Sequence, residues 1–357
     1  MTILWLNLIV VFLFAWVARF YSVPVRIGPK FPHPNKILAG AAAVTLILVS
    51  GLRNNIGDTV FYIHSYEVDK YDLESILRRK DIGFGLLQML LKRISDDPQI
   101  LLFTTALVTN LLIVIVMYKY SRMLELSLYV YITSGAFVVS MNGLRQFLAA
   151  AIVFVATKAL FEGKWKTYMI IVLFASFLHQ SALIMIPIYF IVRRKAWTAS
   201  TFVMLILAII IVVGFNQFSD MLFSAIQNTQ YSEYQSFHEG GANSIRVFVF
   251  AIPLIIAYLG RHKLKEIFPQ SDIIVNLSII GLVLLIISTQ NWIFARMNIY
   301  FNLYQLILFG WIVKLFREKD QKLVYFCILI FYFCYFFFES VITLDIRYKS
   351  NYIVWPF

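Results

Sequence analysis

Residues 164–195 read KWKTYMIIVLFASFLHQSALIMIPIYFIVRRK, an apolar run with basic residues at both ends. Loops rich in Lys and Arg tend to remain on the cytoplasmic side of a membrane. The basic positions 164–166 and 193–195 therefore place both ends of the run on the same face. The sequence predicts a broken helical hairpin over 167–192, with its tip in FLHQS near His179. Broken backbone at membrane depth is tolerated only where protein or water surrounds it.

The rest of the chain has the composition of a membrane protein. Hydrophobic residues make up 61% of it, aromatic residues 17% and charged residues only 14%, which is too apolar for a soluble domain of this size. A helix needs about 20 apolar residues to cross a bilayer. Spans are predicted at 3–19, 37–52, 100–117, 126–141, 146–161, 199–215, 245–259, 273–289, 293–313 and 323–338. With the hairpin, these runs predict an all-α polytopic membrane protein of about eleven or twelve transmembrane segments, forming a single domain over 1–357.

The distribution of basic residues predicts the topology. Of the 31 Lys and Arg residues, 19 lie at 19–36, 119–122, 158–166, 193–195, 261–265 and 314–322. If these segments are cytoplasmic, the other 12 lie outside with 13 of the 19 acidic residues, and both termini are external. A single crossing at 167–192 would instead leave 13 basic residues inside and 18 outside. The net charge of +12 is thus an insertion signal facing anionic lipid, and no nucleic-acid partner is expected.

The first span, 3–19, is expected to be retained in the protein. It lacks a cleavage site of small residues and is followed by Arg19 and Arg26, unlike a removed signal peptide. The sequence contains no Cys/His cluster with metal-ligand spacing, no phosphate-binding glycine loop and no GxSxG motif. We therefore predict neither a metal nor a cofactor.

Five polar residues stand at one end of the apolar segments. Arg53 and Asp58 follow the second span, Arg145 lies in the NGLRQ turn, His179 lies at the hairpin tip, and Arg296 lies at the start of the span 293–313. All five are predicted at the outer face. Cationic groups that separate elements deliver to one side of a membrane indicate a site for an anion, and lipid-attached pyrophosphate is the candidate.

Each of these residues also has a purely structural explanation. Arg53 could extend to the lipid headgroups, and Asp58 could cap a helix or shape a turn. His179 could satisfy backbone carbonyls at the break, while Arg296 could pair with an acid or with Tyr300. The arginine of the NGLRQ turn is the hardest to explain in this way. The coincidence of all five carries more weight than any one of them.

Two outer segments, 53–99 and 216–244, are long enough to form a roof over a substrate. The first contains an amphipathic stretch that is expected to lie flat on the outer leaflet. Its apolar face comprises Leu86, Leu87, Leu90, Leu91 and Ile94. The second carries aromatic and imidazole side chains beside a glycine pair, namely Tyr231, Tyr234, Phe237, His238, Gly240 and Gly241. Tyrosine rings suit sugar faces, but an interfacial aromatic belt is the commoner reason for tyrosines at this depth.

Three stretches of the chain carry the pattern of a known family. They are GLRNNIGDTVFYIHSYE at 51–67, the block from SMNGLRQ through FLHQS to IPIYFI at 140–191, and FARMNIYFNLYQ at 294–305. These stretches resemble three segments of the EpsG family of Wzy-like exopolysaccharide polymerases. The first is similar to the family segment that contains Arg, Gly-Asp and Tyr, and the second to its central block, which runs from a GxRQ turn to an AxxFHxSA kink. The third is similar to its late segment with Arg and Tyr-Phe. One departure is NNIGDT, where the family more often has a Gly-Thr-Asp order.

The resemblance implies a function, which comes from the family and not from the spacing of residues. It implies a glycosyltransferase that joins undecaprenyl-pyrophosphate-linked oligosaccharide repeat units at the outer face of the bacterial cytoplasmic membrane, with a fold like that of the C-type glycosyltransferases. It implies as partners a lipid-linked donor and acceptor, membrane lipid, a chain-length regulator and other assembly proteins. Its matching positions are Arg53, Asp58, Arg145, Gln146, His179 and Arg296. We expect catalysis by Asp58, Arg145, His179 and Arg296, and substrate binding by Arg53, Gln146 and the nearby Tyr62 and His64.

Two other classes of protein fit parts of this pattern. A flippase or secondary transporter also has broken helices, but its binding groups lie near the bilayer midplane and its halves often repeat. No convincing repeat is visible in the sequence. A membrane O-acyltransferase that modifies the polysaccharide could use His179 as its base, but it would need a path for the acyl donor from the cytoplasm.

The topology can be tested by labelling. A cysteine placed near His179 should react with a membrane-impermeant reagent added outside, whereas a cysteine near Arg194 should not. The reason is that only a turn within 167–192 satisfies the distribution of basic residues. Equal labelling of the two positions from the cytoplasmic side would remove the basis for grouping the five residues at one face.

Overall fold

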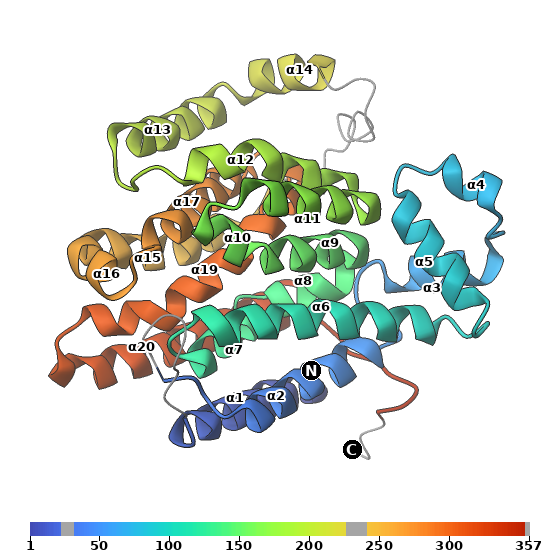
Figure 1. The fold of residues 1–357 in the computed structure, drawn as a ribbon, viewed down its shortest axis with the longest axis horizontal. Coiled ribbons are helices and arrows are strands. Elements are labelled where there is room, and N and C mark those ends of the chain that lie inside the picture. The colour runs from blue at the N-terminus through green and yellow to red at the C-terminus, as the bar shows by residue number, and fades with distance from the viewer. Residues whose placement is uncertain (23–31, 226–240, 354–357) are drawn as a thin grey trace. The chain divides into compact units, whose positions relative to one another are not determined.

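The computed structural model describes residues 1–22, 32–225 and 241–353, and the regular elements among them are helices, with no β-sheet (Figure 1). The chain divides into two compact units. The first unit is Met1–Tyr189 with Phe309–Phe357, and the second is Phe190–Leu308. The single domain over 1–357 stays a prediction.

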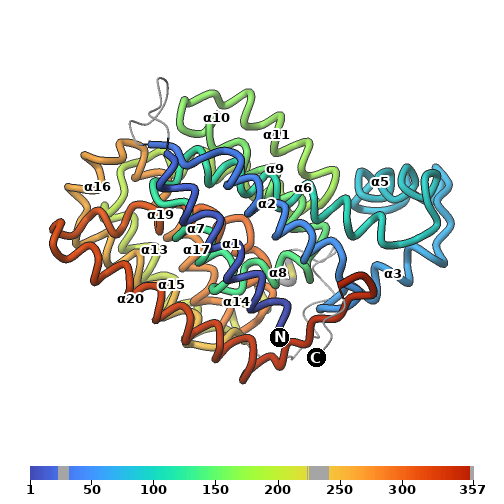
Figure 2. The backbone as a smooth tube through the Cα atoms, turned by 90° about the horizontal axis from the view of Figure 1, so that it is seen from below, coloured from blue at the N-terminus to red at the C-terminus, as the bar shows by residue number. Residues whose placement is uncertain are grey.

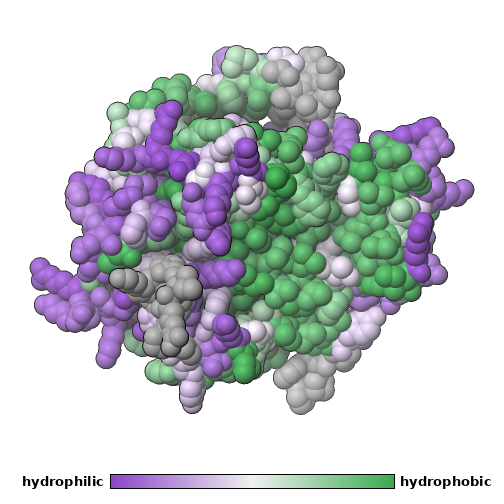
Figure 3. Space-filling model, viewed as in Figure 1, coloured by the Kyte–Doolittle hydropathy of each residue, from purple (hydrophilic) through white to green (hydrophobic). Residues whose placement is uncertain are grey.

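The central helix of the first unit is α6, Gln99–Tyr120. It lies between α2 (Lys36–Gly51) and α9 (Leu144–Val155), while α1 (Thr2–Phe20) packs on α2 and α7 (Leu124–Thr133) (Figures 1 and 2). With 22 residues, α6 is about 33 Å long, which matches a hydrocarbon core of about 30 Å. Apolar side chains cover the face of the molecule over α6 and α9 (Figure 3). The helices of this unit therefore have the length and surface of membrane-spanning helices, and the protein is a multi-pass membrane protein.

Four segments are long and apolar enough to cross a membrane: Thr2–Phe20, Gln99–Tyr120, Leu144–Glu162, which joins α9 to α10 (Thr157–Glu162), and Glu318–Thr343, which joins α20 (Glu318–Phe337) to the π-helix Phe338–Thr343. Three bent pairs raise the number to seven if each pair is one span. They are α7 with α8 (Ala136–Asn142, 56°), α13 (Ala199–Val213) with α14 (Phe215–Ala225, 96°), and α15 (Ser244–Leu259) with α16 (Arg261–Ile267, 82°).

The described residues thus support four to seven spans, fewer than the eleven or twelve that the hydropathy pattern predicts. One reason is that apolar composition does not reveal breaks in the backbone. The run at 126–141 is interrupted at Gly135, whose φ of +83° is incompatible with a continuing right-handed helix. The other reason is length, because six apolar helices have only 10–17 residues. A helix of 14 residues such as α11 (Trp165–Leu178) rises about 21 Å, less than the thickness of the hydrocarbon core.

The helix that is predicted to break near His179 does break there. α11 ends at Leu178, His179 is extended with φ −155° and ψ 116°, and the chain continues as the 3₁₀ turn Gln180–Ile184 and α12 (Met185–Val192). The Tyr168 hydroxyl on α11 donates to the Met185 carbonyl at 3.2 Å, and the rings of Tyr168 and Tyr189 lie 5.0 Å apart. The two legs therefore run back along each other, and His179 lies at the tip.

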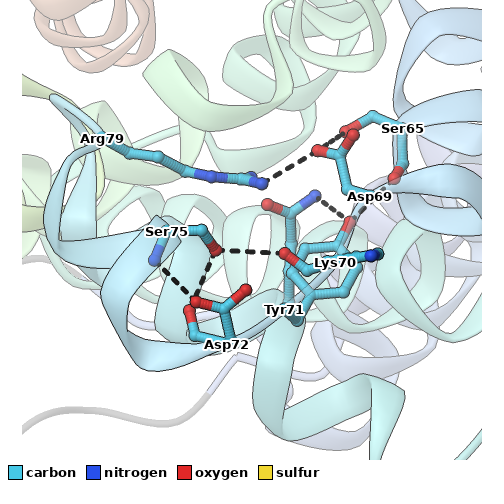
Figure 4. Close-up of polar contacts among 8 residues, drawn as sticks. Ser65, Asp69, Lys70, Tyr71, Asp72, Ser75 and Arg79 are labelled. Atoms are coloured by element: carbon cyan, nitrogen blue, oxygen red, sulfur yellow. Dashed lines mark hydrogen bonds and ion pairs between the residues drawn. The ribbon is translucent and has the colours of Figure 1, made fainter.

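The segment 53–99 folds into three helices, α3 (Thr59–Val68), α4 (Leu73–Leu77) and α5 (Ile82–Lys92). A polar network joins α3 to α4 and the turns beside them (Figure 4): Ser65 donates to Asp69 (2.8 Å), Arg79 to Asp69 (3.0 Å), Tyr71 to the Ser65 carbonyl (3.0 Å) and Ser75 to the Lys70 carbonyl (3.1 Å). The stretch expected to be amphipathic is helical in α5, and its exposed stripe is Leu86, Leu90 and Ile94. Whether this stripe lies on the outer leaflet stays a prediction.

The second unit is built around α17, Ser271–Ile287, which packs on α13 and α15. Its core joins Ala208 of α13 to Ile287 of α17 and to Phe294 of α18 (Ile293–Met297), which precedes α19 (Ile299–Ile312). Of the second roof segment, 216–244, the structure describes α14 and residues 241–244. Tyr231, Tyr234, Phe237, His238 and Gly240, on which the expected sugar contacts and hinge rest, lie outside the described residues.

Both ends of the described chain reach the end of the first unit where α6 begins. There, the Gln99 side chain donates to the Arg53 carbonyl at 3.3 Å. The C-terminal tail meets the same loop, since the Lys349 N–H donates to Asn55 Oδ1 at 2.7 Å. Near the N-terminus, Trp5 packs on the aromatic rings that end α20, the nearest of them 5.1 Å away. The two ends of the described chain therefore lie at one end of this unit.

The opposite end of α6 gathers segments that carry basic residues. The Tyr118 hydroxyl donates to the Pro34 carbonyl at 3.1 Å, and Trp311 Nε1 donates to the Tyr120 carbonyl at 2.8 Å. The rings of Tyr120 and Phe161 lie 5.2 Å apart. Three segments that the charge pattern predicts to be cytoplasmic, 19–36, 119–122 and 158–166, therefore meet at this end.

Candidate functional site

The buried side chain of Asp81, directly before α5, joins two of the predicted site residues. Its carboxylate Oδ2 lies 3.0 Å from a guanidinium nitrogen of Arg145, and its Oδ1 lies 3.8 Å from His179 Nδ1. Oδ1 also accepts a hydrogen bond from the backbone N–H of Gln180 at 3.1 Å. The Asp81 side chain is only 5% exposed. A carboxylate held away from water needs such partners, so Asp81 ties α5, the NGLRQ turn and the hairpin tip together.

Arg145, in the first turn of α9, is held on one side and exposed on the other. Its guanidinium lies 6.0 Å from the ring of Tyr62 and 5.9 Å from that of Phe84. Its side chain is 44% exposed, against 15% for His179. A guanidinium has five donors in a planar fork, and Asp81 occupies one corner of it. Arg145 can therefore contact an anionic ligand without leaving Asp81.

The start of α3 reaches the same neighbourhood. The Asp58 N–H donates to Asn142 Oδ1 at 2.8 Å, three residues before Arg145. Asp58 occupies the N-cap position of α3, but its side chain makes no capping hydrogen bond. Helix capping therefore does not explain this residue. Tyr62 follows one turn later on the same side of α3. Gly57 allows this approach, because its φ is +52° and a Cβ there would lie 2.1 Å from Asn142 Oδ1.

Gln146 and His64 are placed differently from each other. Gln146 is buried, and its Nε2 lies 3.4 Å from the Ser181 hydroxyl just beyond the hairpin tip. His64 is exposed on α3 and makes no hydrogen bond or ring contact with the described residues. The structure therefore brings Gln146 to the hairpin tip and leaves His64 at the surface.

Arg53 is buried, with 1% of its surface exposed. Its Nε donates to the Thr59 hydroxyl at 3.0 Å, and its terminal nitrogens donate to the carbonyls of Met141, at 2.6 Å, and Ser50. Burial lowers the pKa of Arg53 to about 10, so the side chain stays protonated at neutral pH. Arg53 thus holds the ends of α2 and α8 to the start of α3. These contacts favour a positioning role over the direct substrate contact expected from the resemblance.

Arg296 belongs to the second unit. Its guanidinium lies 4.6 Å from the ring of Trp292, one turn earlier in the chain. A cation over an aromatic face is stabilised by the ring quadrupole. The grouping of Arg296 with the first-unit residues stays a prediction from the sequence.

A comparison with protein-family models matches the EpsG family over residues 36–353, most of the chain. The chain belongs to the EpsG family. This membership indicates a role in exopolysaccharide biosynthesis. No curated protein and no solved structure matches the chain, so the likeness to C-type glycosyltransferases stays a prediction.

The sequence did not predict Asp81 as a site residue. In this EpsG-family protein its carboxylate lies between Arg145 and His179, which the sequence did predict. The local signal was DIGFG, in which an acidic residue opens an amphipathic helix and is followed by Gly83 and Gly85. Gly83 packs against the end of α11, where a Cβ would lie 2.8 Å from the Phe177 carbonyl oxygen. This close approach brings Asp81 to the hairpin tip. Nothing in the one-dimensional pattern joins positions 81, 145 and 179.

The packing of Gly83 can be tested with alanine. In Gly83→Ala the new methyl group meets backbone atoms of Phe177, so α5 has to move away from the tip and carry Asp81 with it. We expect a loss of about 1–3 kcal/mol of stability, as for other overpacked sites, together with a lower yield of exopolysaccharide at equal expression.

The matched control is Gly40→Ala in α2, where no heavy atom lies within 4 Å of the new Cβ. Alanine is the better helix former there by about 0.5–1 kcal/mol, so the midpoint of thermal unfolding should hold or rise. If both variants unfold at the wild-type temperature and support equal polymer yield, the contact between α5 and the tip is not what positions Asp81.

Proposed function

We propose that this EpsG-family protein is a polysaccharide polymerase, a glycosyltransferase that joins undecaprenyl-pyrophosphate-linked repeat units. The observation that carries the proposal is the buried Asp81 carboxylate between Arg145 and His179. It places a partly exposed cation and a histidine on either side of one buried carboxylate. These are the two kinds of group that transfer from a pyrophosphate requires, one to stabilise the leaving group and one to accept a proton.

The depth of this cluster supports a site near the outer face. Arg145 lies near the start of Leu144–Glu162, a 19-residue segment about 28 Å long that ends at the basic end of the first unit. His179 ends the 14-residue α11, about 21 Å from its own basic start. The midplane of a hydrocarbon core about 30 Å thick lies about 15 Å from either face. Arg145 and His179 both lie farther than this from the basic end, so they lie beyond the midplane. We infer that the basic end is cytoplasmic, that both termini are outside and that the short apolar helices supply the remaining crossings.

In the proposed reaction, a hydroxyl of the incoming repeat unit attacks the anomeric carbon of the growing chain. The new carbon–oxygen bond forms as the bond to the pyrophosphate oxygen breaks, and the hydroxyl proton passes to His179 or Asp58. Negative charge then develops on the leaving phosphate. Arg145 stabilises this charge, and the sequence pattern predicts the same role for Arg296. Preorganised donors of this kind contribute several kcal/mol in a low-dielectric site.

Other residues support these steps. Asp81 holds Arg145 and the hairpin tip at His179 in place. Arg53 fixes the start of α3 through its hydrogen bond to the Thr59 hydroxyl. Tyr62, His64 and Gln146 would contact the sugars, with 53–99 as the roof. A chain-length regulator and other assembly proteins are the expected partners.

The arrangement favours a transferase over the two alternatives. A transporter holds its substrate with groups near the midplane, whereas the described cluster stands at helix ends. An O-acyltransferase would need a base but not a cation for a pyrophosphate leaving group. Analysis of the product formed from a purified lipid-linked repeat unit separates polymerisation from acylation.

The role of the arginines can be tested with lysine. Arg145→Lys and Arg296→Lys keep the charge but lose the planar fork that holds a phosphate in two places. Each should lower the rate of polymerisation by about 10²-fold or more, the loss seen when one transition-state donor is removed, without changing expression. Arg93→Lys, at an exposed arginine of the same segment as Asp81, is the control and should remain active. Polymer of normal length from both test variants would return these arginines to a structural role.

The base can be identified by comparing His179→Gln with Asp58→Asn. Gln forms hydrogen bonds but cannot accept a proton at neutral pH. If His179 is the base, His179→Gln should lower the chemical step by about 10²- to 10⁴-fold while donor binding holds. A rate that survives His179→Gln but not Asp58→Asn would identify Asp58 as the base. Survival in both variants would leave catalysis to leaving-group stabilisation by the arginines.

A further inference from the structure

The basic end of the first unit contains a cavity of about 130 Å³. Its charged walls come from three segments: Arg19 at the end of α1, Arg122 just before α7 with Glu125 in the first turn of α7, and Lys314 after α19. The other described residues that line it are Ser22, Pro32, Pro34, Met123 and Leu124. Since a water molecule occupies about 30 Å³ of liquid, the space holds a group of a few heavy atoms.

The charges that line the cavity do not cancel. Glu125 is the one acid among three cations in the described lining, and it pairs with Arg19 at 2.8 Å. Lys314 donates to the neutral side chain of Gln321 at 2.8 Å. Arg122 lies over the ring of Trp311 at 5.8 Å. The cavity therefore keeps two positive charges that no carboxylate among the described residues neutralises within ion-pair distance.

The same cations are partly withdrawn from water. Arg122 and Lys314 are each of intermediate exposure, and burial lowers the pKa of the Arg122 guanidinium. Two like charges drawn together in this way repel each other, and a bound anion would relieve both the repulsion and the loss of hydration. Glu125, whose side chain is 2% exposed, keeps Arg19 at the cavity wall.

This cavity is separate from the candidate catalytic site. It lies at the end of α6 that carries Tyr120, whereas Arg53 and Gln99 lie at the start of that helix, about 33 Å away. Basic pockets between membrane helices on the cytoplasmic side are a common way to bind phosphate-bearing headgroups.

We propose that the cavity lined by Arg19, Arg122 and Lys314 binds a phosphate group. Its oxygens accept hydrogen bonds from the Arg122 and Lys314 side chains, and the Arg19–Glu125 pair closes one side. The phosphate comes either from the headgroup of an anionic phospholipid in the leaflet next to this end or from free phosphate in solution. For a headgroup, Met123, Leu124 and the two prolines supply the apolar wall along its glycerol. This proposal does not depend on the proposed polymerase activity.

The test measures thermal unfolding of the full chain in mixed micelles of detergent and phosphatidylcholine. Phosphatidylglycerol is titrated in one arm and inorganic phosphate in the other, each at constant ionic strength. A ligand that binds only the folded protein raises the unfolding midpoint as its concentration rises. Arg122→Gln and Lys314→Gln each remove a charge-assisted hydrogen bond and should raise the apparent Kd about tenfold. Lys119→Gln removes an exposed charge three residues from Arg122, outside the lining, and should leave the Kd unchanged.

A response to phosphatidylglycerol alone that the two cavity variants weaken assigns the site to a lipid headgroup. A response to inorganic phosphate that the same variants weaken assigns it to the free ion. The two variants are independent of each other, so failure of one to fold leaves the other to decide. The proposal is overturned if neither ligand stabilises the wild-type protein, or if Lys119→Gln weakens binding as much as the cavity variants do.

Discussion

The carboxylate of Asp81 imposes the constraint on which the candidate site depends. A buried carboxylate is stable only while cationic and N–H donors surround it, and here they come from two other elements, the NGLRQ turn and the hairpin tip. Since α5 carries Asp81, the segment that leads to α5 is fixed by the same contacts. Removing Arg145 would leave the buried Asp81 carboxylate without its cation, so the ion pair holds these elements as a group.

Two features of the surrounding fold make this grouping possible. Gly83 has no side chain, so α5 can approach the Phe177 carbonyl at the end of α11. Arg53 is the second, because its guanidinium bonds to groups on α2, α3 and α8 and fixes the direction in which α3 leaves the helix before it. The effect of Gly83 and Arg53 is to bring Tyr62 beneath the guanidinium of Arg145.

The first unit separates its polar groups by the length of α6. One end carries Arg53 and the two ends of the described chain. The other end carries the basic residues that line the cavity. Two polar ends about 33 Å apart with apolar helices between them are what a bilayer requires of a protein that crosses it. The ion pair between Arg19 and Glu125 shows that a specific side-chain contact, and not only an excess of basic residues, organises the basic end.

Composition and charge placement by themselves determined the class of the protein, the break at His179 and most members of the site. These follow from local chemistry, because apolar length, basic flanks and a polar residue in an apolar run are read directly along the chain. The family pattern added Tyr62 and Gln146. The number of continuous spans was overestimated, because hydropathy does not detect a bend such as that at Gly135. Only the tertiary structure decided that Arg53 is buried and that Asp81 joins Arg145 to His179. Arg145 and His179 lie 64 and 98 positions after Asp81 in the sequence. Contacts over such separations depend on how the helices pack, whereas a sequence pattern gives only the spacing of residues along one helix.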